Sequence, residues 1–113
     1  MKLKVINKKA YHIVELDGPL RAGNEYDLAD KVERFFEKGS VPKFIIDLSK
    51  VPTINSATLG VFLNIHKRAE QMNGRFSLSG VNREVEKLME ITKLTSILEI
   101  HKNIEEAIES YED

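Results

Sequence analysis

The chain has 113 residues, of which 42% are apolar and 31% are charged, so we expect one folded domain over residues 1–113. Seventeen basic and eighteen acidic residues leave a formal charge of −1, which argues against nucleic acid or an anionic membrane as a partner. Cysteine is absent, which excludes disulfides, thiolate metal ligands and a cysteine nucleophile. We find neither a secretory leader nor a membrane-spanning run, and we expect a soluble cytoplasmic protein.

The first half of the chain predicts two paired strands, a helix and a buried strand. Residues 2–6 and 11–16 are strand-like, and the short polar segment between them is typical of an antiparallel hairpin. Apolar residues at helical spacing predict a helix over 25–38, with Asn24 as its side-chain cap. The continuous apolar run 44–46 indicates a central strand that is covered on both faces.

The second half continues this alternation of strands and helices. The predicted elements are a helix over 56–72, a strand over 75–81, a helix after the cap Asn82, a short strand over 97–101 and a helix after the cap Asn103. Successive strand-helix-strand units need right-handed crossovers, which place the strands parallel. The fold class is therefore α/β, with an opening antiparallel hairpin, then parallel strands, and about four helices on the sheet.

No motif of a common enzyme or nucleotide-binding loop is present. The three histidines, His12, His66 and His101, lack the spacing of zinc ligands, so we expect no metal site. The sequence contains neither GxxxxGK[ST] nor GxGxxG, and Ser56 is not part of a GxSxG elbow. We therefore expect a non-enzymatic protein without a cofactor.

The most informative segment is 47–60, which joins the buried strand to a helix whose first turn carries small and hydroxyl-bearing residues. Such a helix start presents unpaired backbone N–H groups and the positive end of the helix dipole, and both favour a phosphate or a carboxylate. The alternative is that Asn55 or Ser56 is simply the helix cap.

This segment resembles the strand-to-helix junction of STAS domains, and in particular of the small stand-alone bacterial anti-sigma-factor antagonists. Those proteins typically show D-L-S-x-V-x-F-[IM]-D-S-S-G-L-G, and residues 47–60 align with this pattern without a gap. The resemblance extends over residues 18–20, 73–74 and 88–94, and so over nearly the whole chain. It implies a single STAS domain over 1–113, in which the helices lie mainly on one face of a mixed sheet.

The departures from the family pattern concern charge and phosphorylation. In the family the second Ser of the D-S-S triplet is phosphorylated by a cognate anti-sigma-factor kinase, and the resemblance places Ala57 at this phosphoacceptor position. Ala57 cannot be phosphorylated, so Ser56 and Thr58 are the candidate substitutes. The Asp of the triplet corresponds to Asn55, and an acidic residue of the preceding loop corresponds to Arg21. This end of the molecule is therefore less acidic than the family pattern.

The resemblance implies a regulatory protein-binding module whose partner is an anti-sigma factor or a related kinase-like regulator. The predicted partner-binding surface, here called the pole, consists of Arg21, Lys50, Asn55, Ser56, Ala57 and Thr58. In the family, a phosphate in this interface disfavours docking by charge repulsion and desolvation. A chain with Ala57 at the acceptor position is therefore expected to stay in its binding form.

Two other functions remain open. An accessory subunit, such as the STAS partners of ABC-type lipid transporters, needs no phosphorylation and fits Ala57 equally well. A sensor of small anions or nucleotides would use the helix start, with Arg21 and the hydroxyls of Ser56 and Thr58 as donors. For that site we expect the Arg21 guanidinium to face residues 55–58, and the alternative is a solvated loop arginine.

Overall fold

A computed structural model describes residues 1–21, 23–37, 39 and 41–112 of the chain. Within them one sheet has the strand order β1-β2-β3-β4-β5. The strands are β1 (Lys2–Asn7), β2 (His12–Asp17), β3 (Lys43–Lys50), β4 (Arg75–Ser79) and β5 (Glu99–His101). β1 pairs antiparallel with β2, and the other neighbouring strands pair in parallel. The predicted mixed sheet, with an opening hairpin followed by parallel strands, is confirmed.

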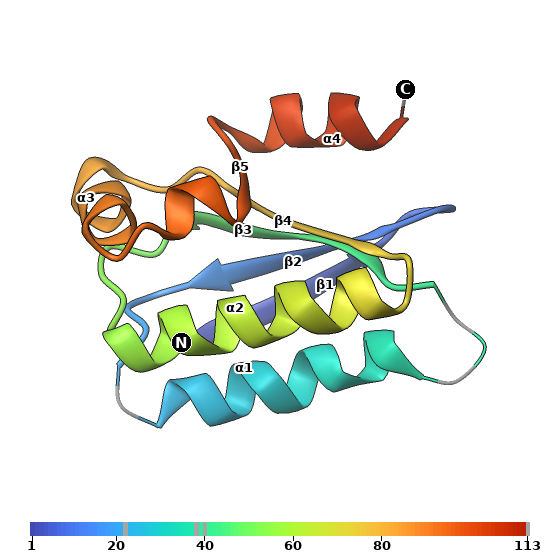
Figure 1. Cartoon of the computed structure of the whole chain (residues 1–113), viewed down its shortest axis with the longest axis horizontal. Coiled ribbons are helices and arrows are strands. Elements are labelled where there is room, and N and C mark those ends of the chain that lie inside the picture. The colour runs from blue at the N-terminus through green and yellow to red at the C-terminus, as the bar shows by residue number, and fades with distance from the viewer. Residues whose placement is uncertain (22, 38, 40, 113) are drawn as a thin grey trace.

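Helices cover both faces of this sheet, but mainly one of them (Figure 1). The described α-helices are α1 (Asn24–Glu33), α2 (Ser56–Gln71), α3 (Arg83–Ile91) and α4 (Ile104–Glu112), and the 3-10 helices are η1 (Arg34–Phe36) and η2 (Leu94–Ser96). Side chains of α1, α2 and α3 pack into the larger apolar core, whereas Ala107 of α4 packs with Tyr11, Ile13 and Ile45 on the other face. The predicted arrangement of the helices is therefore confirmed. None of the described helices is long and apolar enough to cross a bilayer.

Two helix caps predicted from the sequence are present. The Asn82 side chain accepts a hydrogen bond from the backbone N–H of Val85 at 2.8 Å, and Asn103 accepts one from the backbone N–H of Glu106 at 2.8 Å. Each bond satisfies one of the N–H groups that the first turn of a helix leaves without an intrahelical partner. The starts of α3 and α4 are therefore fixed by local sequence.

The first helix differs from the prediction at both ends. Asn24 is the first residue of α1 and not its cap, and Gly23 takes the cap position with a φ of 99°. The reason is that the Asn24 side chain accepts a hydrogen bond from the backbone N–H of Arg21 at 3.1 Å, so it faces the preceding loop. At the other end, α1 stops at Glu33 and continues as a 3-10 turn to Phe36. Position 38, the predicted end, lies outside the described residues.

Two strands are shorter than predicted. β4 ends at Ser79 because Gly80 adopts a φ of 70°, in the left-handed region that an extended strand does not use. β5 begins only at Glu99, because the backbone N–H of Leu98 donates to the carbonyl of Leu94 at 2.9 Å and extends the preceding turn. Apolar residues alone do not distinguish such a turn from the start of a strand.

The central strand is buried along most of its length, as predicted. Residues 44–48 of β3 are all buried. Phe44, Ile46 and Leu48 pack into the larger core, whereas Ile45 packs towards α4. Because successive side chains of a strand point to opposite faces, this pattern requires cover on both sides of the sheet.

A polar clamp holds α4 on the sheet. The Tyr111 hydroxyl donates to the backbone carbonyl of Phe44 at 3.0 Å. The Arg75 guanidinium lies 3.9 Å from the centre of the Tyr111 ring, and its Nη1 donates to the Ser110 carbonyl at 3.1 Å. Its Nε donates to Glu99 at 2.9 Å. Burial alone would raise the pKa of Glu99. Its hydrogen bonds with Arg75 and His101 outweigh the effect of burial, so the pKa of Glu99 is lowered.

We expect Arg75→Ala to loosen α4 selectively, because it removes the cation from the Tyr111 ring and the donors to Glu99 and Ser110. The loss of charged hydrogen bonds should lower the free energy of unfolding by about 2 kcal/mol. The rate of amide hydrogen exchange should rise more in α4 than in β3. Arg83→Ala, at an exposed position of α3, is the control. Unchanged exchange in α4 of Arg75→Ala would show that the contacts of Arg75 do not hold this helix.

Candidate functional site

The pole lies where the loops after β2 and β3 meet, at the end of the sheet where α2 begins (Figure 1). The backbone N–H of Gly18 donates to the Lys50 carbonyl, and that of Leu20 donates to the Thr53 carbonyl, both at 2.9 Å. Leu20 and Ile54 also form an isolated parallel bridge. The loop after β2 was expected beside residues 55–58, and the structure places its backbone contacts on the residues just before them.

The first turn of α2 is fixed by Asn55. Its Oδ1 atom accepts hydrogen bonds from the backbone N–H of Thr58 at 2.9 Å and from the Thr58 hydroxyl at 2.7 Å. The structure thus confirms that Asn55 caps the helix, which was one of the two readings of this segment. An Asp side chain can accept the same two bonds. Compared with an Asp at this position, Asn55 therefore keeps the cap and carries no negative charge.

The three residues that follow the cap differ in their exposure. Ser56 and Ala57 are exposed, whereas Thr58 is completely buried. The Thr58 hydroxyl is directed to Asn55, inside the turn. Among residues 56–58, Ser56 therefore presents the hydroxyl that solvent or another protein can reach.

Two exposed cations lie in the loops at this end of the molecule. Lys50 is exposed at the end of β3, and Arg21 is exposed in the loop after β2. The backbone of Arg21 is held by hydrogen bonds in both directions with Asn24, at 3.1 Å to the Asn24 side chain and 3.0 Å from the Asn24 backbone N–H. The structure therefore brings the predicted residues to one end of the molecule. An anion site at Arg21 stays a prediction.

Hydrogen bonds that the sequence did not predict hold the loops of the pole in place. Asp47 accepts hydrogen bonds from the backbone N–H of Ser49 at 3.1 Å and from the Ser79 hydroxyl at 3.3 Å, which joins the ends of β3 and β4. Asn82 Nδ2 donates to the Pro52 carbonyl at 2.9 Å, so the cap of α3 also holds the loop after β3. The cap itself was predictable, but this second bond joins residues that are distant in sequence.

Gly80 allows the ends of β3 and β4 to approach each other. A Cβ atom at this position would lie 2.9 Å from Ser49 Cβ and 3.1 Å from Asp47 Oδ1, and the φ of 70° also favours glycine. A larger residue here would push β4 away from the end of β3. The position of the loop at residues 49–54 thus depends on a glycine outside the segment 47–60.

The pole has the features of a docking surface. Polar side chains at this end of the sheet hold backbone groups of the neighbouring loops, and the pole presents one exposed helical turn and two exposed cations. Within the described part of the chain, no group of three or more His, Asp or Glu side chains is placed to hold a metal ion. The arrangement offers a surface for another protein or an anion.

The comparisons with known proteins agree with this fold. The model of the STAS domain family matches residues 3–107. A Thermotoga neapolitana protein, named as a TM1081 homolog in the anti-sigma factor antagonist class, is 39% identical over 77 residues, which cover 68% of this chain and 67% of that protein. The anti-sigma-B factor antagonist of Listeria monocytogenes is 38% identical over 80 residues, which cover 68% of this chain and 69% of that protein.

A solved structure is similar over nearly the whole chain. The crystal structure of TM1081 from Thermotoga maritima superposes with a TM-score of 0.89 at 28% identity, and the match covers 98% of this chain and 95% of that chain. The helices and the sheet thus have the arrangement found in TM1081. The chain therefore belongs to the STAS domain family, and it is similar to the anti-sigma factor antagonists within that family.

Proposed function

We propose that this chain is a regulatory module that docks an anti-sigma factor, or a related kinase-like regulator, through its pole. The observation that carries the proposal is the exposed turn at Ser56 and Ala57, which Asn55 caps and which begins at the meeting point of two loops. The names of the similar proteins support the class of partner. A binding role also agrees with the hydrogen bonds by which Asn55 and Asn82 hold the backbone at this end of the molecule.

The rigidity of the pole suits it to protein binding. Backbone hydrogen bonds from Gly18 and Leu20 join the two loops, and Asn82 holds the second loop from α3. A surface that is ordered before binding loses less conformational entropy when a partner docks. The exposed turn therefore meets its partner in a fixed geometry.

Charge at this turn is a means of control. A phosphate adds about two negative charges, and inside an interface it disfavours docking by repulsion and by the cost of desolvation. Lys50 and Arg21 lie on the same end of the molecule, so an acidic partner surface would be repelled by a phosphate and attracted by these cations. Docking should therefore be sensitive to a single charge on the first turn of α2.

The geometry favours Ser56 as the residue through which a kinase would act. Ala57, which the resemblance places at the acceptor position, has no hydroxyl, and that assignment stays a prediction. Thr58 is buried and its hydroxyl is bound to Asn55. A kinase that acts on this turn therefore has Ser56 as its reachable hydroxyl.

The exposed hydroxyl of Ser56 replaces the permanent binding form that was expected from Ala57 alone. Treatment with a kinase of the anti-sigma class and Mg-ATP should therefore place phosphate on Ser56 and leave Thr58 unmodified, because a kinase cannot reach a buried hydroxyl. Mass spectrometry of proteolytic fragments identifies the site. Ser56→Ala should remove the phosphate, and Thr58→Val is the matched control. Phosphate on Thr58 would contradict the proposed geometry. A wild-type chain that gains no phosphate, together with an Ala57→Ser variant that does, would instead support a permanent binding form.

Docking should weaken when a charge is placed on the exposed turn. For Ala57→Asp we expect an affinity at least about tenfold lower, which corresponds to about 1.4 kcal/mol, because the new carboxylate must be desolvated in the interface. Isothermal titration calorimetry against purified anti-sigma factors measures this effect. Ala10→Asp is the matched control, since Ala10 is exposed in the turn between β1 and β2, at the other end of β2.

Circular dichroism establishes that both variants fold. If Ala57→Asp and Ala10→Asp bind as well as the wild type, the interface lies away from the first turn of α2. If the wild type binds no anti-sigma factor and instead binds an ATPase subunit of a lipid transporter, the accessory-subunit function is favoured. Either result would overturn the proposal in a distinguishable way.

A further inference from the structure

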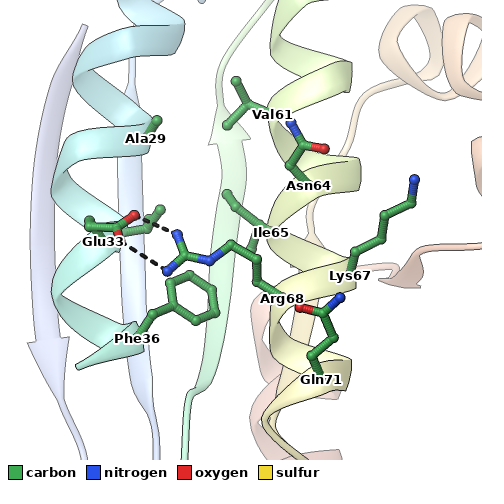
Figure 2. Close-up of a pocket in the computed structure, with 10 residues that line it drawn as sticks. Ala29, Glu33, Phe36, Val61, Asn64, Ile65, Lys67, Arg68 and Gln71 are labelled. Atoms are coloured by element: carbon green, nitrogen blue, oxygen red, sulfur yellow. Dashed lines mark hydrogen bonds and ion pairs between the residues drawn. The ribbon is translucent and has the colours of Figure 1, made fainter. Parts of the chain in front are cut away.

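A groove runs between α1 and α2, and its lining contains none of the residues of the pole (Figure 2). Its volume is about 400 Å³, which is within the usual range of small-molecule sites. It is lined by Ala29, Val32, Glu33, Phe36, Val61, Asn64, Ile65, Lys67, Arg68 and Gln71. The two helices run side by side on one face of the sheet, so the groove follows the line between them (Figure 1).

The floor of the groove is apolar. Val32, Phe36 and Ile65 are buried, and Ala29 and Val61 are half-buried. Ala29 on α1 has the smallest of these side chains, and it leaves space opposite α2. An aliphatic chain placed here would remove apolar surface from water on both sides, which is the main source of affinity for such a ligand.

The groove already contains a carboxylate that is bound to an arginine. Arg68 Nη1 and Nη2 donate to the two carboxylate oxygens of Glu33, at 2.5 Å and 2.9 Å, and Figure 2 shows this pair crossing from α2 to α1. The Arg68 guanidinium also lies 4.2 Å from the centre of the Phe36 ring. The ring and the two hydrogen bonds hold the guanidinium across the groove, between α2 and α1.

The Arg68 guanidinium can accept a second carboxylate. A guanidinium has five N–H donors, and Glu33 uses one on each terminal nitrogen. The side chains of Arg68 and Glu33 are 43% and 60% exposed, and ion pairs this exposed contribute little free energy, so Glu33 can also be displaced. With Lys67, whose ammonium points away from the pair in Figure 2, the lining carries a net charge of +1.

We propose that this groove binds small amphipathic carboxylates, with the aliphatic chain along Ala29, Val61 and Ile65 and the carboxylate on the Arg68 guanidinium. The apolar floor selects for a chain, and the fork of donors selects for a planar anion over a neutral head group. The site is separate from the pole, so the proposal does not depend on the partner of the protein.

The test is a titration with octanoate, below its micellar concentration, followed by the backbone amide shifts of the protein. Saturable shifts are expected at Ala29, Val61 and Ile65. Octan-1-ol, which has the same chain without the charge, should bind at least about tenfold more weakly, since a charge-assisted pair is lost. Acetate, which has the charge without the chain, should produce no saturable shift in the groove.

Variants separate the contributions of the chain and the carboxylate. Arg68→Gln should lower the affinity for octanoate about tenfold and remove the preference over octan-1-ol. Glu33→Gln should raise the affinity for octanoate, because it removes a competing negative charge from Arg68. Ala29→Phe should fill the groove and abolish binding of both ligands. Arg83→Gln, on an exposed position of α3, is the control and should bind octanoate like the wild type.

Three results would overturn the proposal. Octanoate shifts that spread over the surface without saturating would show non-specific binding. Equal affinity for octanoate and octan-1-ol would show an apolar groove without a carboxylate site. An octanoate affinity that is unchanged in Arg68→Gln would show that the carboxylate does not lie on Arg68. None of these outcomes bears on docking at the pole, which the Ala57→Asp experiment tests separately.

Discussion

The burial of β3 on both faces is the constraint on which the rest of the structure depends. Five successive residues, 44–48, are buried, and their side chains alternate between the two faces of the sheet. The face with the larger apolar core is covered by α1, α2 and α3, and the opposite face is covered by α4. Since β2 and β4 pair in parallel with β3, the carboxyl ends of all three strands lie at one edge. The loops that leave this edge form the pole.

Polar side chains at this edge stabilise the loops that carry the exposed turn. Asp47 joins β3 to β4, Asn55 caps α2, and Asn82 holds the loop between them. Within the described residues, no buried side-chain nitrogen or oxygen lacks a hydrogen-bond partner. A polar group that already has its partners strengthens the local structure, because leaving it unpaired would cost free energy. The chemistry of the pole therefore supports a fixed surface for docking.

Local sequence predicted the elements, and long-range contacts decided their details. The apolar run at 44–46 and the caps Asn82 and Asn103 were predictable, because each depends on residues a few positions apart. The clamp between Arg75 and Tyr111 was not predictable, since it joins residues on different elements and periodicity says nothing about such pairs. The start of α1 differs from the prediction because of a short-range contact and not a long-range one. The backbone N–H of Arg21 donates to the Asn24 side chain, so this side chain does not cap the helix.

The motif alone could not show which hydroxyl of the pole is exposed to solvent. Neighbouring residues of a helix point about 100° apart, so Ser56 and Ala57 face solvent while Thr58 faces the core. The resemblance aligns these residues with a pattern but says nothing of which side chain is reachable. Burial of Thr58 requires that Asn55 caps the helix, and the cap in turn determines the direction of Ser56.

The two surfaces of α2 should act independently. Ala57 and Arg68 are about 16 Å apart along the axis of the helix, at the usual rise per residue. This separation is about twice the screening length at physiological ionic strength, so an anion on Arg68 exerts little direct electrostatic effect on the pole. Coupling would instead need a movement of α2, which its cap at Asn55 and its packing through Phe62 and Ile65 oppose. An anion on Arg68 is therefore expected to leave docking at the pole unchanged, whereas the other end of the groove, at Val61, lies one helical turn from Ala57.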